Sequence, residues 1–566
     1  MKQSFSLGQF GSSIRETTQQ MDSDRFIQRL WSRDVTLWKD DPEHQKIIAS
    51  SLGWLSLPEM LLEEAPQLNA FAEEIRGEGF NHLLLMGMGG SSLCPEVFRR
   101  AFGRIQGYPQ LLVLDSTDPA TVWRMEKTAD LSRTLFIVSS KSGTTTEPLM
   151  FYHYFFDKVA GAGPDPGRNF IAITDPGSEL ERIAGEKGFR RVFQNMADVG
   201  GRYSALSYFG MVPAALMGLD VKKFLEGAAS AGLKCGPDVP AARNPAAQLG
   251  AALGELARQG RDKITLVIPP PLDSLGLWIE QLIAESTGKE GQGILPVAGE
   301  RLGPPGVYAE DRVFLYIRTE GGASPKIEAE LEALKEAGHP VIGQVLPDLL
   351  SLGSEFFLWE FATALAGALL GINPFDQPDV QESKDNTRRL MEIFRKKGRL
   401  PGQEVLVEEQ GCQIFGEIAS KRQTLADTTR VHLDRVREGD YVALSAYIPE
   451  TGEHDQLLEA IRLRVRDVLK VATAVGYGPR FLHSTGQLHK GGTDNGLFIQ
   501  ITAAESEDLT IPGESFTFGV LNQAQALGDF QSLVRRHRPV LRFHLGRDVG
   551  AGLKTLLDVV GRALMQ

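Results

Sequence analysis

The fold of this 566-residue chain is decided at residues 82–92, His82-Leu83-Leu84-Leu85-Met86-Gly87-Met88-Gly89-Gly90-Ser91-Ser92. A short apolar run that ends in glycines is typical of a buried strand turning directly into a helix. Similar runs recur at Leu111–Leu114, Leu135–Ser139 and Phe170–Thr174, with helix-like stretches between them. Strands that alternate with helices predict a parallel sheet with helices on both faces.

The same alternation resumes twice further along the chain. Apolar runs at Ile264–Ile268 and Val313–Ile317 follow the Gly/Pro/Asp/Ala-rich stretch Cys235–Pro245, and a third series follows Pro401 and Gly402. We therefore expect an α/β protein with two doubly wound parallel-sheet units and a C-terminal α/β region. The expected parts are a helical leader (1–75), a first unit (76–234), a second unit (235–400) and the C-terminal region (401–566).

Composition and charge exclude several functional classes. Lys and Arg number 60 and Asp and Glu number 72, so the formal net charge is −12. An acidic chain is a poor partner for nucleic acid or an anionic membrane. The start is polar, and the apolar stretch Trp359–Ile372 is too short and interrupted to span a bilayer. Three sparse cysteines, Cys94, Cys235 and Cys412, favour a reducing compartment, so we expect a cytoplasmic protein.

The glycine loop after the first strand has three interpretations. Glycines allow the backbone to approach an anion, and the following helix start offers free N–H groups, which favours a phosphate site. A dinucleotide fingerprint requires a third glycine where Ser92 stands, although Asp115 ends the next strand as a ribose-binding residue would. The loop could also be only a tight strand–helix turn.

A second loop, Ser139-Ser140-Lys141-Ser142-Gly143-Thr144-Thr145-Thr146-Glu147-Pro148, is rich in hydroxyl groups. Hydroxyl and N–H groups at a helix start satisfy phosphate oxygens without a large positive field. The alternative is a helix cap, but one hydroxyl is enough for that role. The loop therefore favours a phosphate-binding function.

These two loops, with three later segments, resemble the glucose-6-phosphate isomerase family, whose members are built from sugar isomerase domains. The further segments are Val199–Ser204, Glu285–Lys289 and Gly371–Pro378, and the match covers roughly residues 80 to 390. The leader and the last third are similar to the isomerase half of fused transaldolase–isomerase proteins. The transaldolase half is absent from this sequence, which does not tell whether it is encoded separately.

The resemblance implies reversible conversion of glucose 6-phosphate to fructose 6-phosphate through an enediolate, by a homodimer without metal or cofactor. We find no His-x-x-x-His or Cys-x-x-Cys spacing for a metal. Glu285 would move the proton between C1 and C2, Arg202 would stabilise the enediolate, and Lys384 would lie near the ring oxygen. Substrate-binding roles are implied for Gly89, Gly90, Ser91, Ser140, Lys141, Ser142, Thr144 (through its backbone), Thr145, Gly201, Gln281 and Gln377.

The family also uses a histidine to open the sugar ring, and here its position is rearranged. Between Glu285 and Lys384 stands only His339, in a Gly-His-Pro sequence typical of a turn. The later segment Phe481–Gly492 resembles the family's histidine segment and holds His483 and His489. We expect His483 to act in ring opening, with His489 as the alternative. The loop should lie against the face carrying Glu285 and Lys384, within the chain or across a subunit boundary.

Other interpretations of the same residues stay open. Alone, Glu285 could be a solvated carboxylate at a helix end, and Lys384 a surface lysine. A regulator that senses sugar phosphates could share the fold, although it would not need Glu285, Arg202 and Lys384 together. Mannose 6-phosphate is a further candidate substrate, because the sequence does not determine whether the opposite face of C2 is also reprotonated.

Overall fold

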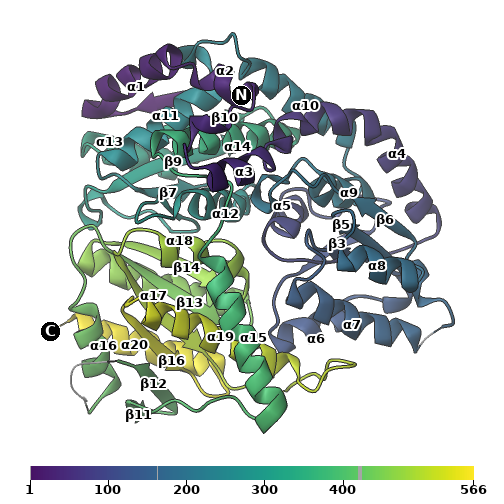
Figure 1. Cartoon of the computed structure of the whole chain (residues 1–566). Coiled ribbons are helices and arrows are strands. Elements are labelled where there is room, and N and C mark those ends of the chain that lie inside the picture. Colours follow the sequence, from purple (N-terminus) through teal and green to yellow (C-terminus); the bar gives the residue numbers. More distant parts are fainter. Residues whose placement is uncertain (1, 162, 418–422, 506, 566) are drawn as a thin grey trace.

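The computed structural model describes residues 2–161, 163–417, 423–505 and 507–565, and within them the strands form three sheets (Figure 1). The first sheet is entirely parallel, in the order β3-β2-β4-β5-β6. Its strands are β2 (His82–Met86), β3 (Gln110–Leu114), β4 (Thr134–Ser139), β5 (Phe170–Thr174) and β6 (Arg191–Gln194). The expected parallel sheet is therefore confirmed, and the glycine loop follows β2.

The second sheet has the order β1-β10-β9-β7-β8. Its parallel strands are β7 (Lys263–Val267), β8 (Leu295–Val297), β9 (Arg312–Thr319) and β10 (Val341–Leu346). β1 (Lys2–Ser6) pairs antiparallel with β10, with Lys2 opposite Val345. The leader was expected to be helical, but it begins with a strand. These residues cover the open edge of the second sheet by pairing with β10, which lies more than three hundred residues further along the chain.

Helices cover both sheets. In the leader they are α1 (Gly11–Ser23), α2 (Phe26–Trp31), α3 (Pro42–Ala49) and α4 (Leu57–Gly77). In the first unit they are α5 (Leu93–Phe102), α6 (Pro119–Thr128), α7 (Thr146–Ala160), α8 (Glu179–Glu186), α9 (Tyr208–Leu216) and α10 (Val221–Lys234). Around the second sheet lie α11 (Pro245–Arg258), α12 (Leu275–Thr287), α13 (Pro325–Glu336) and α14 (Leu352–Leu369). One apolar core runs from Phe10 to Phe375 through all of these parts.

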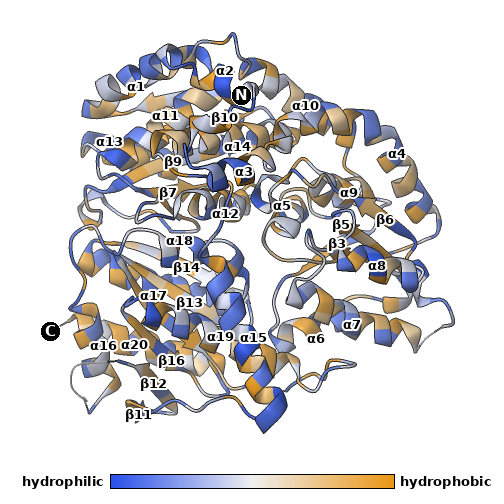
Figure 2. Cartoon of the chain, viewed as in Figure 1, coloured by the Kyte–Doolittle hydropathy of each residue, from blue (hydrophilic) through white to orange (hydrophobic). Residues whose placement is uncertain are grey.

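Helix α14 is a long and strongly apolar helix of this core, and its colour in Figure 2 is largely hydrophobic. The stretch Leu349–Leu369 is long and apolar enough to cross a membrane, but most of it is buried inside the protein. It packs against α10, α11 and α12. Its apolar character is therefore explained by burial in the core.

The C-terminal region forms the third sheet, in the order β11-β12-β16-β15-β13-β14. Its strands are β11 (Val407–Glu409), β12 (Cys412–Gly416), β13 (Tyr441–Tyr447), β14 (Ala472–Tyr477), β15 (Gly496–Thr502) and β16 (Val540–His544). Its helices are α16 (Leu425–Leu433), α17 (Gly452–Leu469), α18 (Gly486–Gly491), α19 (Phe518–Arg535) and α20 (Val549–Leu564). Helix α15 (Val380–Lys397) connects to it and packs along α19 (Figure 1).

Helix α12 lies where the three parts of the molecule meet (Figure 1). It contacts α5 of the first unit, α14 of the second and α18 of the C-terminal region. All of its residues except Leu277 are buried. Side chains on this one helix can therefore face groups from every part of the chain.

Candidate active site

Two glycines of the loop after β2 permit close approach of three segments. The loop forms a short 3₁₀ helix, η4 (Gly89–Ser91). Gly89 has φ +53°, and a Cβ there would lie 2.8 Å from Nε2 of Gln281 and 3.0 Å from Cβ of His483. A Cβ on Gly90 would lie 1.9 Å from the carbonyl oxygen of Gly201. The glycines thus let the loop pack directly on α12, the histidine loop and the turn before Arg202.

The hydroxyl-rich loop lies beside it, between β4 and α7. Ser140 donates a hydrogen bond to Oγ1 of Thr145 at 3.3 Å. The backbone N–H and the hydroxyl of Thr144 both donate to Oγ of Ser142, at 3.3 and 3.1 Å. Ser139 donates to the carbonyl oxygen of Ser91 at 2.9 Å, which ties the two loops together. A cluster of hydroxyl groups therefore stands at the carboxyl ends of β2 and β4, at the start of α7.

The ammonium group of Lys141 is directed elsewhere. It pairs with the carboxylate of Asp175 and donates to the carbonyl oxygen of Ala197 at 2.9 Å. Asp175 and Ala197 follow the carboxyl ends of β5 and β6. The contacts of the Lys141 side chain with them therefore fix the shape of the loop. Any contribution of Lys141 to anion binding in this arrangement comes from its backbone.

Glu285 lies on α12 with a cation and an amide beside its carboxylate. Nη1 of Arg202 is 3.4 Å from its Oε1, and Nε2 of Gln281 donates to its Oε2 at 3.1 Å. Gln281 is one helical turn earlier, on the same face. Only 8% of Glu285 is exposed, so it is not the solvated helix-end carboxylate that was the alternative.

Arg202 is held rigidly by its surroundings. It lies on the 3₁₀ helix η7 (Gly201–Tyr203) and is 3% exposed. Its guanidinium donates to Ser286 at 2.7 Å, to Gln377 at 3.0 Å, and to the carbonyl oxygens of Pro374 and Asp376 at 2.6 and 2.8 Å. A cation fixed in this way can stabilise a developing negative charge without reorganising.

The loop that holds Arg202 is itself held by a buried lysine. The ammonium group of Lys289 donates to the carbonyl oxygens of Asn373 and Asp376 and pairs with the Asp376 carboxylate at 2.7 Å. Burial, with the nearby charge of Arg202, lowers the pKa of Lys289 to about 8. Lys289 thus fixes the Asn373–Asp376 segment, whose carbonyl oxygens accept hydrogen bonds from Arg202.

His483 reaches the site from the C-terminal region, on the 3₁₀ helix η11 (Arg480–His483). Its carbonyl oxygen accepts a hydrogen bond from Gln281 at 2.8 Å, and its Nε2 lies 3.2 Å from Oε1 of Glu147. Gln525 donates to the same Glu147 oxygen at 2.7 Å and accepts from Thr117 at 2.7 Å. All of these groups belong to one chain.

Glu147 was quoted in the sequence only as part of the hydroxyl loop and received no role. It is the second residue of α7 and is buried. Burial acts to raise its pKa, but the charge and hydrogen bond of His483, with the charge of Lys384, hold that pKa below its ordinary value. The available signal in the sequence was an acidic residue directly after the hydroxyl-rich loop. The sequence could not show its partner, because His483 lies 336 positions away.

His489 and His339, the other two histidines considered in the sequence, are packed among aromatic side chains. Nδ1 of His489 is hydrogen-bonded to the Tyr441 hydroxyl at 2.9 Å, and its ring packs against Phe498. Burial lowers the pKa of His489 to about 3, so this imidazole is neutral at working pH. His339 stacks edge-on against Phe314 under the second sheet.

Lys384 is exposed on the first half of α15, and its charge acts on Glu147.

Asp115, which a dinucleotide site would need for the ribose, is instead paired with both Nε and Nη2 of Arg480, at 2.7 and 2.8 Å. This pairing removes the support for the dinucleotide interpretation. Among the described residues no group of three His, Cys, Asp or Glu side chains could hold a metal ion.

The model of the phosphoglucose isomerase family matches residues 67–291. A glucose-6-phosphate isomerase of Rubrobacter xylanophilus is 32% identical over 63% of this chain and 90% of its own length. A hypothetical protein of Thermus thermophilus superposes with a TM-score of 0.59 at 26% identity, over 69% of this chain and 99% of its own. The fold is also similar to a glucose-6-phosphate isomerase of Chlamydia trachomatis (TM-score 0.50, 22% identity, 66% and 78% covered).

Proposed function

The chain belongs to the phosphoglucose isomerase family and interconverts glucose 6-phosphate and fructose 6-phosphate, and we propose that Glu285 transfers the proton between C1 and C2. The single observation that supports this role is the contact of its carboxylate with Arg202 at 3.4 Å. A carboxylate takes the C2 proton from the open-chain aldose, which leaves an enediolate with its charge on O1. The hydroxyl proton of O2 then passes to O1, and the proton held by the carboxylate is returned to C1, which gives the ketose. Arg202 stabilises the enediolate charge through a buried, fixed guanidinium.

The phosphate group of the substrate is assigned to the hydroxyl cluster. Ser140, Thr145 and Ser142 offer hydroxyl groups, and the start of α7 offers N–H groups and its positive dipole end. The loop of Gly89 and Ser91 closes the other side of this cluster. Binding the phosphate here would place the sugar carbons toward Gln281 and Glu285.

Ring opening is assigned to His483 together with Glu147. Opening requires one proton to be placed on the ring oxygen and one to be removed from the C1 hydroxyl, and imidazole is suited to both transfers near neutral pH. The Glu147 carboxylate, 3.2 Å from Nε2 of His483, orients this imidazole. Lys384, whose charge acts on the same carboxylate, lies toward the ring oxygen in this scheme.

We propose that the enzyme is a homodimer and that it acts in the cytoplasm. Both proposals rest on the family resemblance alone. His483 contacts Glu147 and Gln281 of its own chain. The proposed units are 1–75, 76–234, 235–400 and 401–566, with the last supplying the histidine. We propose, on the same resemblance, that this additional region corresponds to that of the isomerase half of fused transaldolase–isomerase proteins.

The test is a coupled assay with fructose 6-phosphate, run with the wild type and with Glu285→Gln. We expect kcat of the variant to fall by ~10²–10⁴-fold with little change in KM, since positioned proton transfer is worth that much. A sugar-phosphate sensor would show binding without turnover. Retention of more than about a tenth of wild-type kcat by Glu285→Gln would assign the proton transfer to another group.

A further inference from the structure

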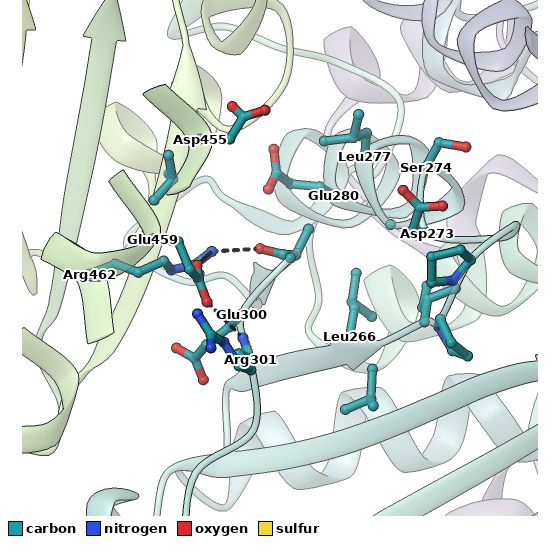
Figure 3. Close-up of a pocket in the computed structure, with 18 of the residues that line it drawn as sticks. Leu266, Asp273, Ser274, Leu277, Glu280, Glu300, Arg301, Asp455, Glu459 and Arg462 are labelled. Atoms are coloured by element: carbon teal, nitrogen blue, oxygen red, sulfur yellow. Dashed lines mark hydrogen bonds and ion pairs between the residues drawn. The ribbon is translucent and has the colours of Figure 1, made fainter. Parts of the chain in front are cut away.

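A cavity of about 800 Å³ lies between the second unit and the C-terminal region (Figure 3). It opens at the carboxyl ends of β7 and β14, with α17 on one side and α12 on the other. Gly276, Leu277 and Glu280 face it from α12, whereas Gln281 and Glu285 lie on a different face of that helix. Ligands of parallel sheets bind at carboxyl strand ends, so the location suits a second binding site.

Glu280 is the feature that indicates a ligand. It is 7% exposed and its carboxylate projects from α12 into the cavity (Figure 3). Within the described part of the chain no hydrogen bond or ion pair joins it to another side chain. Ser274, at the start of the same helix, also lines the cavity and has a buried hydroxyl oxygen without a partner. Buried polar groups without partners cost free energy unless something else satisfies them.

Two of the arginines that line the cavity are held by other partners. Arg480 pairs with Asp115 at 2.7 Å and with Glu450 at 2.9 Å. Arg462 donates to the carbonyl oxygen of Ala298 at 2.9 Å and also to that of Thr473. The lining holds seven acidic side chains and five basic ones, so the walls carry a net negative charge when the acids are ionised.

Much of the remaining wall is apolar. Leu266, Leu277, Leu458, Val475 and Phe481 line it, so the cavity offers a carboxylate next to apolar surface. Asp455 adds a second acidic group whose only described partner is the Tyr477 hydroxyl, at 2.6 Å. Such a combination complements a molecule with one positive charge and a compact apolar body.

We propose that this cavity binds a small organic amine, whose ammonium group pairs with the carboxylate of Glu280. The proposal does not rest on the isomerase activity, because none of the residues assigned to catalysis lines the cavity. An anion is disfavoured because the acidic side chains of the lining outnumber the basic ones. A neutral polyol would exchange hydrogen bonds with the protonated carboxyl group of Glu280 and would release no proton, which separates it from an amine in the titration described below.

Binding of an amine should release a proton. Burial raises the pKa of Glu280 to about 8, with Arg462 and Arg480 acting in the opposite direction. The other charged groups that line the cavity are Asp273, Glu300, Glu330, Glu450, Asp455 and Glu459 and the cations Arg100, Arg301 and Lys326. At pH 7 the empty site therefore holds its proton, and an ammonium group that stabilises the carboxylate displaces about 0.9 of a proton per site.

The test is isothermal titration of the full-length protein at pH 7 with cyclohexylamine hydrochloride, in two buffers of different ionisation enthalpy. Cyclohexanol and cyclohexanecarboxylate serve as probes of the same shape. We expect the amine to bind with release of close to one proton, and both other probes to bind at least about tenfold more weakly, which corresponds to one lost charge-assisted contact. Saturating fructose 6-phosphate should leave the amine affinity unchanged.

Two variants locate the site. Glu280→Gln keeps the shape, loses the charge, and should weaken amine binding at least about tenfold. Leu277→Trp fills the cavity while retaining the carboxylate, and should weaken all probes. Glu336→Gln, exposed on α13, is the control and should bind as the wild type does. Undetectable amine binding, equal binding of cyclohexanol, an unaffected Glu280→Gln variant or displacement by fructose 6-phosphate would each overturn the proposal.

Discussion

Glu355 offers a test of the structure through the pH dependence of stability. It lies on α14 and is completely buried, with neither carboxylate oxygen hydrogen-bonded. Burial raises its pKa from 4.5 to about 8. The folded protein therefore keeps a proton that the unfolded chain releases. Its stability is undiminished below pH 4.5 and falls as the pH rises toward 8.

The size of the effect follows from the two pKa values. Each pH unit between the two pKa values costs about 1.4 kcal/mol of stability. Because the unfolded chain releases the Glu355 proton, the free energy of unfolding is lower by about 3 kcal/mol at pH 7 and about 4 kcal/mol at pH 8. Glu355→Gln resembles the protonated acid in shape and does not ionise. We expect it to match the wild type at pH 5 and to be more stable by these amounts at higher pH.

The assay is urea unfolding followed by tryptophan fluorescence at pH 5, 6, 7 and 8. Trp359 lies one helical turn from Glu355 and Trp278 lies in the same core, so the signal reports on this part of the molecule. Glu63→Gln, exposed on α4, is the control and should show no pH-dependent difference. A constant difference in midpoint between Glu355→Gln and the wild type at all four pH values would refute the reasoning.

Three further predictions concern the active site. Ser140→Ala combined with Thr145→Ala should raise both the inhibition constant of inorganic phosphate and KM, because each lost charge-assisted hydrogen bond weakens binding by roughly 1.5–3 kcal/mol. An unchanged inhibition constant would mean that the loop is only a helix cap. His483→Ala should slow turnover of the cyclic hexose phosphate but spare C1/C2 proton exchange in an open-chain substrate, whereas His489→Ala should affect neither, and the reverse result would exchange their roles. Glu147→Gln should reproduce the His483→Ala pattern in weaker form and shift the pH profile of kcat/KM; a profile identical to the wild type would mean that Glu147 only packs against the imidazole.

The alternation of strands and helices was predictable from the sequence, because it depends on local periodicity. The runs at His82–Met86 and Phe170–Thr174 became β2 and β5, and the expected α/β fold is confirmed. The phosphate interpretation of the loops also came from local chemistry, since hydroxyl groups and glycines at a helix start form a contiguous signal. The leader strand β1 was missed because its partner strand β10 lies far along the chain.

What only the tertiary structure decided are the pairings between distant segments. Lys141 turns to Asp175, and Asp115 turns to Arg480, because folding brings their strand ends together. His483 reaches Glu147 over 336 positions, while His489, six residues later, is buried against Tyr441. The sequence shows both histidines in one polar segment. Which imidazole faces the carboxylate depends on how η11 and α18 pack on the rest of the chain, and that packing is a property of the whole core.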